Sequence, residues 1–236
     1  SKMKKFITSL FALVCLALFS YSNATAGGIG VGVTVSALDI EASGSETDDG
    51  DTSDASDQST SVANDVNIGS FYAEYATDNN FALGWEFTPG SADVSDKVQT
   101  RTDTETSVTG TNTTTSNSRK FSAQAEVDAY NTIYAEVPVG SFFYVRAGVS
   151  QVDVNTTEVA SGNGGSYGNT TLDGMNYGFG VKGIRGERLR WKLAYEVTDF
   201  DQLSLTSSGN STGSNTNTIK ADLDVTAIKL SLGLQF

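Results

Sequence analysis

Single charged residues recur within segments that otherwise alternate between apolar and small or polar residues. Carboxylates, amines and phenols are the groups available for acid–base chemistry, because the sequence contains no histidine and its one cysteine is Cys15. Without imidazole there is no Ser-His-Asp or Cys-His relay and no histidine ligand for a metal ion. We therefore expect no enzymatic activity, no cofactor and no metal centre, and we interpret the charges as members of ion pairs.

Six of these charges lie at a similar distance from a short polar segment or from the C-terminus: Glu74, Glu86, Arg146, Lys182, Lys192 and Lys229. The alternation places them on the face opposite the large apolar residues, together with Glu196, Asp128 and Glu126 further along. Charges that are enclosed by protein are costly unless they are paired. The pattern predicts a structural plug of paired charges, and the alternative is a gated ion path whose pairs exchange partners.

Alternation with a period of two residues is the dominant pattern of the chain. At its start Ile29, Val31 and Val33 alternate with glycine and threonine, as in a β-strand with two different faces. Eight segments follow this pattern, and each is close to the roughly 9 to 11 residues that a tilted membrane strand needs. They are residues 29–37, 70–75, 81–88, 121–137, 143–150, 175–182, 189–198 and 228–236.

Short and long connections alternate along the chain. The short ones are residues 78–80, 138–141 and 186–188, and the long polar ones are residues 42–65, 89–118, 156–171 and 206–217. In an up-and-down meander every second connection lies at the same end, so one rim carries tight turns and the other carries long loops. The sequence therefore predicts an all-β fold, a closed antiparallel up-and-down eight-stranded transmembrane β-barrel. Within the second loop, the Thr-x-Thr pattern of residues 100–115 predicts a hairpin turning near Gly110.

A soluble β-sandwich would show the same alternation, with the apolar face as its core. In a membrane barrel the apolar face meets lipid and the polar face fills the interior. We favour the barrel because an even-stranded meander closes without exposed edges, and because the polar face is rich in glycine and alanine, as a narrow lumen requires. In the barrel the plug becomes a lumen charge cluster, with members Glu74, Glu86, Arg146, Lys182, Lys192, Glu196 and Lys229.

Residues 1–26 have the features of a secretory signal peptide, with extra residues ahead of Met3. A cationic start is followed by an apolar run from Phe6 to Phe19 and by the small-x-small site Ala24-Thr25-Ala26. An N-terminal membrane anchor is the alternative, but it needs about 20 unbroken apolar residues. We expect cleavage before Gly27 and one mature domain, residues 27–236, with both of its ends in the periplasm.

The negative net charge limits the kinds of partner that the protein can bind. The formal net charge is −13, whereas nucleic-acid binding needs clustered Lys and Arg, so no nucleic-acid partner is expected. Calcium prefers oxygen ligands, and the first long connection contains seven carboxylates without Lys or Arg: Glu46, Asp48, Asp49, Asp51, Asp54, Asp57 and Asp65. Their spacing does not follow the Asp-x-Asp-x-Asp-Gly pattern of an EF-hand loop. We expect a solvated acidic loop, with weak cation bridging to lipopolysaccharide as the alternative.

The chain ends in Lys229-Leu230-Ser231-Leu232-Gly233-Leu234-Gln235-Phe236. With this ending and the eight alternating segments, the mature chain resembles the small outer-membrane barrels of the OmpA-transmembrane and OmpX type. The resemblance implies that the ending is the assembly signal read by the barrel assembly machinery, carried by Lys229, Leu232, Leu234 and Phe236. Ser231 stands where that signal often has glycine. We expect no periplasmic domain after it, so peptidoglycan binding is not implied.

These observations predict a monomeric outer-membrane protein of a Gram-negative bacterium with a structural or surface-interaction role. Its expected partners are outer-membrane lipids, lipopolysaccharide and the barrel assembly machinery, with host or phage surfaces contacting its loops. The alternative is transport, either as a small pore for ions or solutes or as a conduit for apolar molecules. A secreted soluble adhesin is a third hypothesis. The barrel enzymes that this chain resembles in architecture use a catalytic histidine, which is absent here.

Overall fold

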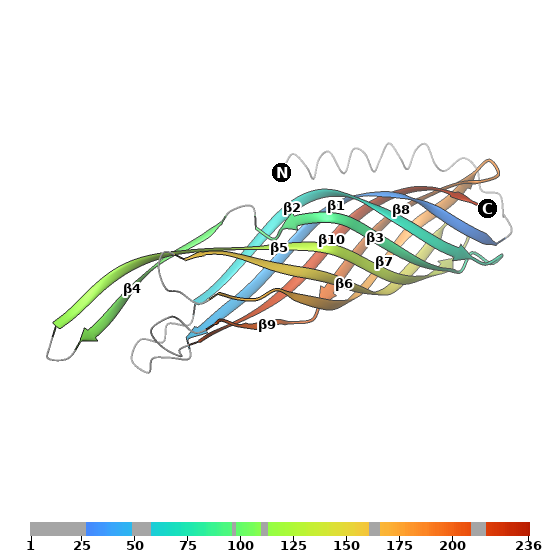
Figure 1. The fold of residues 1–236 in the computed structure, drawn as a ribbon. Coiled ribbons are helices and arrows are strands. Elements are labelled where there is room, and N and C mark those ends of the chain that lie inside the picture. Colours follow the sequence, from blue (N-terminus) through green and yellow to red (C-terminus); the bar gives the residue numbers. More distant parts are fainter. Residues whose placement is uncertain (1–26, 49–57, 96–97, 110–112, 161–165, 209–215) are drawn as a thin grey trace.

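The computed structural model describes residues 27–48, 58–95, 98–109, 113–160, 166–208 and 216–236. Within them the chain forms ten β-strands, most of which surround a common axis, while β4 projects away from the others (Figure 1). Among these residues no helix has the length and apolarity to cross a bilayer. The strands are β1 (Gly28–Asp48), β2 (Gln58–Ala76), β3 (Ala82–Asp93), β4 (Gln99–Thr109), β5 (Thr113–Val139), β6 (Phe143–Ala160), β7 (Thr170–Arg185), β8 (Leu189–Phe200), β9 (Leu203–Thr206) and β10 (Asn217–Gln235).

Eight of the strands close into an antiparallel ring. The order is β1-β2-β3-β5-β6-β7-β8-β10, and β10 pairs with β1 to complete it. β4 pairs with β5 beyond the ring, and β9 continues the line of β8 along β10. The predicted eight-stranded up-and-down barrel is confirmed, and so is the predicted hairpin of residues 100–115. The signal peptide, the turn near Gly110 and residues 49–57 of the acidic loop lie outside the described residues.

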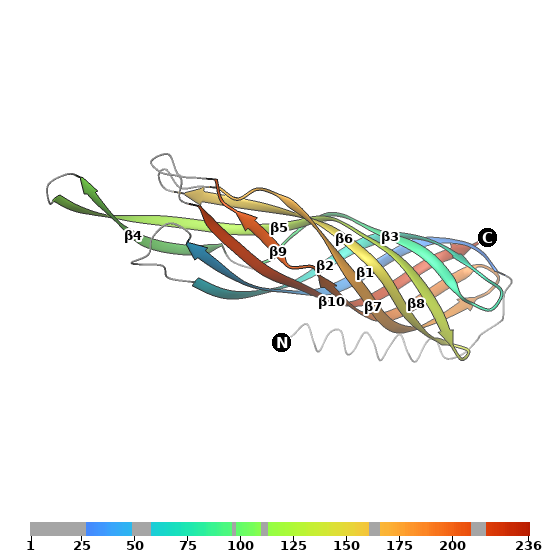
Figure 2. The same cartoon turned by 90° about the horizontal axis from the view of Figure 1, so that it is seen from below.

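Tight turns and both ends of the described chain lie at one rim of the barrel. Asn80, Gly140 and Gly186 have φ angles of 64°, 74° and 67° in these turns, a left-handed conformation that glycine and asparagine tolerate best. At the same rim Ile29 and Phe236 exchange two backbone hydrogen bonds, of 3.2 and 2.8 Å. The C-terminus is therefore sealed against β1 at the end opposite the long connections (Figure 2).

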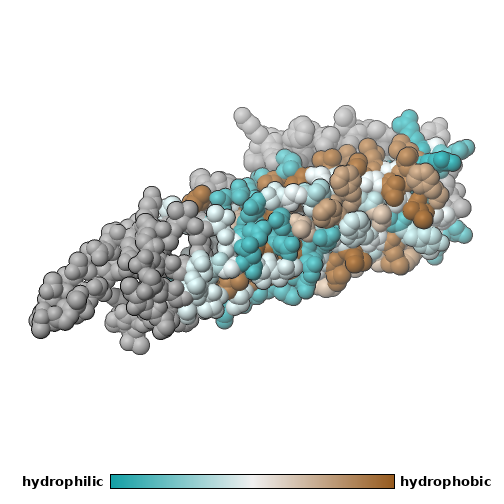
Figure 3. Space-filling model, in the orientation of Figure 1, coloured by the Kyte–Doolittle hydropathy of each residue, from teal (hydrophilic) through white to brown (hydrophobic). Residues whose placement is uncertain are grey.

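The two faces of the sheet change character along the barrel axis. Near the tight turns the outward side chains are apolar and exposed, such as Val33 and Phe179, whereas farther along β1 Leu38 and Ile40 are buried inside and Glu41 is exposed. Figure 3 shows brown residues toward the tight turns and more teal residues toward the long connections. Apolar side chains suit hydrocarbon and polar ones suit water. The reversal therefore marks where a bilayer would end, and the barrel continues beyond it.

The interior has three layers. Charges lie near the tight turns. A layer of hydroxyl groups follows. Hydrogen bonds join the hydroxyl oxygens of Thr132 and Ser150 at 2.8 Å and those of Tyr130 and Thr198 at 2.7 Å. The third layer, nearest the long connections, is an upper apolar cluster like the core of a soluble protein, formed by Leu38, Ile40, Val94, Val152, Val154, Leu172, Phe200, Leu223, Val225 and Ala227.

A β-bulge in β5 reverses the predicted faces of the residues that precede Ala129. The register with β6 shifts between Asp128 and Asn131, and Ala129 within the shift has a φ of 50°. One extra residue reverses the faces of a strand. Val127, predicted to face lipid, packs against the upper apolar cluster. Asp128, predicted to point inward with Glu126, instead accepts a hydrogen bond of 3.0 Å from Asn155 Nδ2 on the outer face of β6.

Candidate functional site

The lumen charge cluster lies inside the half of the barrel that carries the tight turns. All seven predicted members are buried there, each with less than a tenth of its surface exposed. Because they come from six strands, only the closed ring of strands brings them together. They are Glu74 on β2, Glu86 on β3, Arg146 on β6, Lys182 on β7, Lys192 and Glu196 on β8, and Lys229 on β10.

Four charges form a closed upper ring. Glu86 pairs with Arg146 and with Lys229, each at 3.0 Å. Glu196 pairs with the same two basic groups at 2.9 and 3.0 Å. The Ser70 hydroxyl donates a further hydrogen bond of 2.7 Å to Glu86. Each charge has two neighbours of opposite sign, so the upper ring is neutral and its carboxylates have little need of water.

Five charges form an open lower chain nearer the tight turns. Glu74 pairs with Arg190 at 2.9 Å and with Lys192. Lys192 also pairs with Glu136 at 2.7 Å, and Glu136 pairs with Lys182 at 2.9 Å. Basic and acidic groups alternate along the lower chain, which begins and ends with a basic residue. It therefore carries one more positive than negative charge.

Three tyrosine rings fill the space between the charges, and each lies opposite a glycine of the neighbouring strand. A Cβ atom on Gly180 would lie 2.8 Å from the ring of Tyr144. A larger residue would force the ring to move, because protein interiors are close-packed. Glycine thus gives the ring a place against the barrel wall. The three cross-strand pairs are Gly32 with Tyr72, Gly84 with Tyr134, and Gly180 with Tyr144.

Tyr134 joins the two groups of charges. Its hydroxyl donates a hydrogen bond of 3.0 Å to Glu74 in the lower chain. The guanidinium of Arg146, in the upper ring, lies 3.6 Å from the centroid of its ring. A cation over an aromatic face is attracted to it electrostatically. Upper ring and lower chain are therefore one connected network.

Two members of this network, Glu136 and Arg190, are not among the predicted charges. Both lie within two residues of a predicted short connection, whereas the predicted level lies deeper in the strands. Their signal was the same alternation, which places both on the polar face. Glu136 is completely buried.

The arrangement holds charge in place and leaves little room for it to move. Four carboxylates face five basic side chains across the lumen. An ion that crossed would have to lose water and displace existing pairs, both of which are costly in a buried site. In the part of the chain that is described, no group of three His, Cys, Asp or Glu residues is placed to hold a metal ion. This geometry fits the structural plug.

The residues of the predicted assembly signal divide between the two faces of β10. Lys229 belongs to the upper ring. Leu232, Leu234 and Phe236 are exposed on the outer, apolar face, with 66% of Phe236 accessible. Their recognition by the assembly machinery stays a prediction.

A closed antiparallel barrel that is apolar outside and charged inside is the architecture of integral outer-membrane β-barrels. The chain belongs to the family described as outer membrane protein beta-barrel domain, whose model matches residues 8–236. This membership points to the bacterial outer membrane.

Several solved structures of outer-membrane proteins are similar to this chain. The outer membrane protein OprG from Pseudomonas aeruginosa is 12% identical, with a TM-score of 0.51, and the match covers 91% of this chain and 98% of OprG. Ail, the attachment invasion locus protein of Yersinia pestis, is 12% identical with a TM-score of 0.41, covering 90% of this chain and 100% of Ail. The outer membrane protease OmpT from Escherichia coli is 6% identical with a TM-score of 0.45, covering 92% and 99%. No curated protein matches the sequence significantly.

Proposed function

We propose that this protein is a non-conducting structural barrel of the outer membrane that presents an extended acidic surface outside the cell. The observation that carries this proposal is the network of eight ion pairs across the lumen. A barrel of eight strands has an interior just wide enough for side chains. Paired charges in such a bore oppose the passage of ions and solutes.

The outer face beyond the polarity reversal supports a role in surface interaction. Carboxylates lie directly opposite one another across neighbouring strands: Asp39 faces Asp65, and Asp224 faces both Glu41 and Asp199. Like charges placed directly opposite weaken a sheet. A surface that keeps them is better explained by contact with the surroundings than by stability.

The proposal includes partners and orientation. Surrounding lipids and lipopolysaccharide contact the outer face, the barrel assembly machinery inserts the monomer, and host or phage surfaces meet the long connections. The rim with the tight turns and both chain ends faces the periplasm. No enzymatic role is proposed, because the lumen offers no histidine and its carboxylates are already paired.

Conductance of the refolded protein in planar bilayers tests the proposal. The wild type should show only rare, small events. The double variant Glu74→Gln with Glu86→Gln, which leaves basic groups unpaired, should conduct more often, whereas Glu41→Gln on the outer face should behave as the wild type does. A steady, large conductance in the wild type that is unchanged in the double variant would contradict the plug and favour the pore.

A further inference from the structure

The barrel wall is open between β2 and β3. These strands pair from Ala76 and Ala82 up to Phe71 and Phe87. Beyond Phe71, β2 continues to Gln58 along β1 alone among the described strands, and β3 continues along β5. Farther up, Asn64 Nδ2 donates a hydrogen bond of 2.6 Å to the carbonyl of Asp93. We call the opening between these two points the β2–β3 seam.

The backbone of β3 accounts for the seam. Its register with β5 shifts between Thr88 and Ser91, and Pro89 and Gly90 lie within the shift. Proline has no N–H to donate to a neighbouring strand. Gly90 has a φ of 86°, a conformation that favours glycine and turns the strand away from regular pairing. The sequence of β3 therefore determines where the seam begins.

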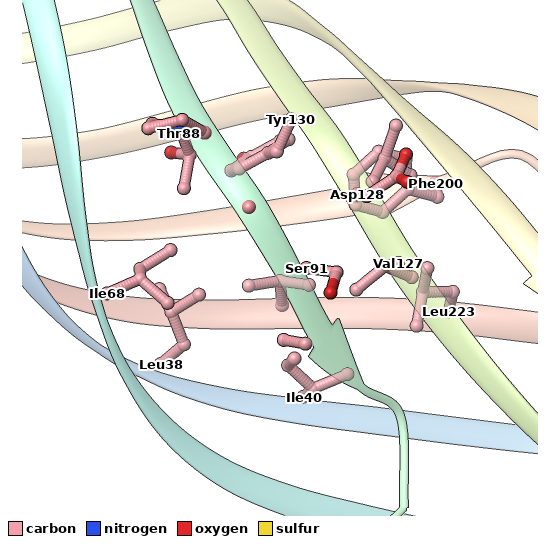
Figure 4. Close-up of a pocket in the computed structure, with 15 residues that line it drawn as sticks. Leu38, Ile40, Ile68, Thr88, Ser91, Val127, Asp128, Tyr130, Phe200 and Leu223 are labelled. Carbon is pink, nitrogen blue, oxygen red and sulfur yellow. The ribbon is translucent and has the colours of Figure 1, made fainter.

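Behind the seam lies an apolar groove. It is shallow: the space that a water-sized sphere can occupy is about 40 Å³, and the whole hollow, including the part that is open to the surroundings, is about 470 Å³. In Figure 4 Leu38 and Ile68 lie between the diverging ribbons of β2 and β3. Val127, Phe200 and Val225 line the groove from the far walls, which makes it a side opening of the upper apolar cluster.

The groove continues the surface that faces lipid. Immediately below the seam, Phe71 and Trp85 point outward and are exposed, and Trp85 stacks on Phe87 with ring centroids 5.9 Å apart. Strand pairing is complete from these residues down to the tight turns and ends where the seam begins. Because hydrocarbon tolerates no unpaired backbone, the seam must lie at the edge of the hydrocarbon layer. A chain that leaves that layer there meets an apolar surface instead of water.

We propose that the β2–β3 seam binds one hydrocarbon chain of a lipid in the outer leaflet, which lies in the groove against the upper apolar cluster. Continuity with the lipid-facing surface selects this occupant, since the groove has apolar walls and opens at the height where acyl chains begin. Exposed apolar grooves of this kind mark interaction sites. The inference goes beyond the proposed function, because a plugged lumen requires no lipid in the barrel wall.

Photocrosslinking tests this proposal. The full chain is refolded into vesicles of phosphatidylethanolamine in which a small fraction carries a diazirine on one acyl chain, and labelled residues are mapped by mass spectrometry. We expect labels on inward-facing residues of the groove, including Ile68 and Val127, in addition to the outward-facing Phe71 and Trp85. Labels confined to outward-facing residues would overturn the proposal.

Two matched variants separate binding from folding. Ile68 and Val66 both point inward from β2 and are half-buried against the upper apolar cluster, but only Ile68 lines the groove. Ile68→Asn should reduce labelling of the groove roughly tenfold, because an unpaired amide in an apolar site is costly, while Val66→Asn should leave it within about twofold. Heat-modifiable migration checks that both variants fold. Equal labelling of the groove in the two variants would contradict the proposal.

A second probe distinguishes the source of the chain. A diazirine-labelled free fatty acid replaces the labelled phospholipid in the same vesicles. If the free acid labels the groove and the phospholipid does not, a small apolar molecule is the occupant and the assignment to a lipid is wrong. Both arms are independent of conductance, so they remain interpretable whether or not the lumen proves to be plugged.

Discussion

Glu86 on β3 and Glu196 on β8 share the same two basic partners, Arg146 and Lys229, with nitrogen–oxygen distances of 2.9 to 3.0 Å. Neither carboxylate can lose its partners without affecting the other. The four strands that carry these residues are therefore joined through the lumen as well as through the barrel wall.

Removing one carboxylate of the upper ring should destabilise the barrel. Glu86→Gln leaves Arg146 and Lys229 with one acid between them, and breaking a buried pair costs about 3 to 5 kcal/mol. The double variant Glu86→Gln with Lys229→Met should lose less than the sum of the single variants. Urea unfolding in lipid vesicles measures both. Additive losses would show that the ring is not energetically coupled.

The glycine opposite Tyr134 should be intolerant of a side chain. The Cβ of Gly84→Ala would overlap the Tyr134 ring, which would move it away from Glu74 and Arg146. Overpacking of this kind costs about 1 to 3 kcal/mol. Gly69→Ala on the outer face is the control, because its nearest neighbour would lie at 3.9 Å. The prediction fails if the two variants unfold at the same urea concentration.

The last residue should control insertion. Phe236→Asp should cross the inner membrane normally but accumulate without folding, because the Phe236 side chain is exposed on the outer, apolar face, where a carboxylate would meet lipid. Phe143, another exposed aromatic at the same rim, gives a matched comparison: Phe143→Ala should assemble better than Phe236→Ala. The folded fraction is measured by heat-modifiable migration in outer-membrane preparations. Wild-type amounts of folded Phe236→Asp would exclude the assembly role.

Protease access should reveal the orientation. Trypsin added to whole cells should cut after a basic residue of the long polar connection 89–118, since polar connections are the usual sites of nicking. Arg188, in a tight turn at the other rim, should be cut only after the outer membrane is permeabilised. Mass spectrometry of the fragments identifies the sites. Cleavage of intact cells at Arg188 alone would invert the topology.

The acidic outer face should make stability depend on pH. Burial, followed by the negative charges of Asp199 and Asp222, raises the pKa of Asp224 above its ordinary value. The stabilisation from protonating Asp224 is therefore complete below its unfolded pKa and is lost as the pH rises through its folded pKa. Asp224→Asn should be more stable than the wild type at neutral pH, with the difference shrinking as the pH falls toward about 4. Urea unfolding at low salt measures this difference, and Asp201→Asn is the control. An equal gain at every pH would argue against titration of Asp224.

The sequence determined the architecture of the barrel and the faces of most of its strands. Alternation of the kind seen at Ile29, Val31 and Val33 is local, so it can be recognised without knowing any partner strand. The strict order of short and long connections then left the up-and-down ring as the arrangement that closes without exposed edges. The buried, inward position of all seven predicted charges follows from this periodicity.

Tertiary structure decided which charges meet and where the periodicity breaks. Glu74 and Arg190 are 116 residues apart in the sequence, and their contact depends on the stagger of strands around the ring, which no local pattern encodes. The bulge at Ala129 reversed the faces of Val127 and Asp128, because one extra residue in a strand exchanges its two sides. The upper apolar cluster also depends on the tertiary structure. Water lies outside the part of the wall that extends beyond the hydrocarbon layer, so apolar side chains in that part are stable only on its inner face.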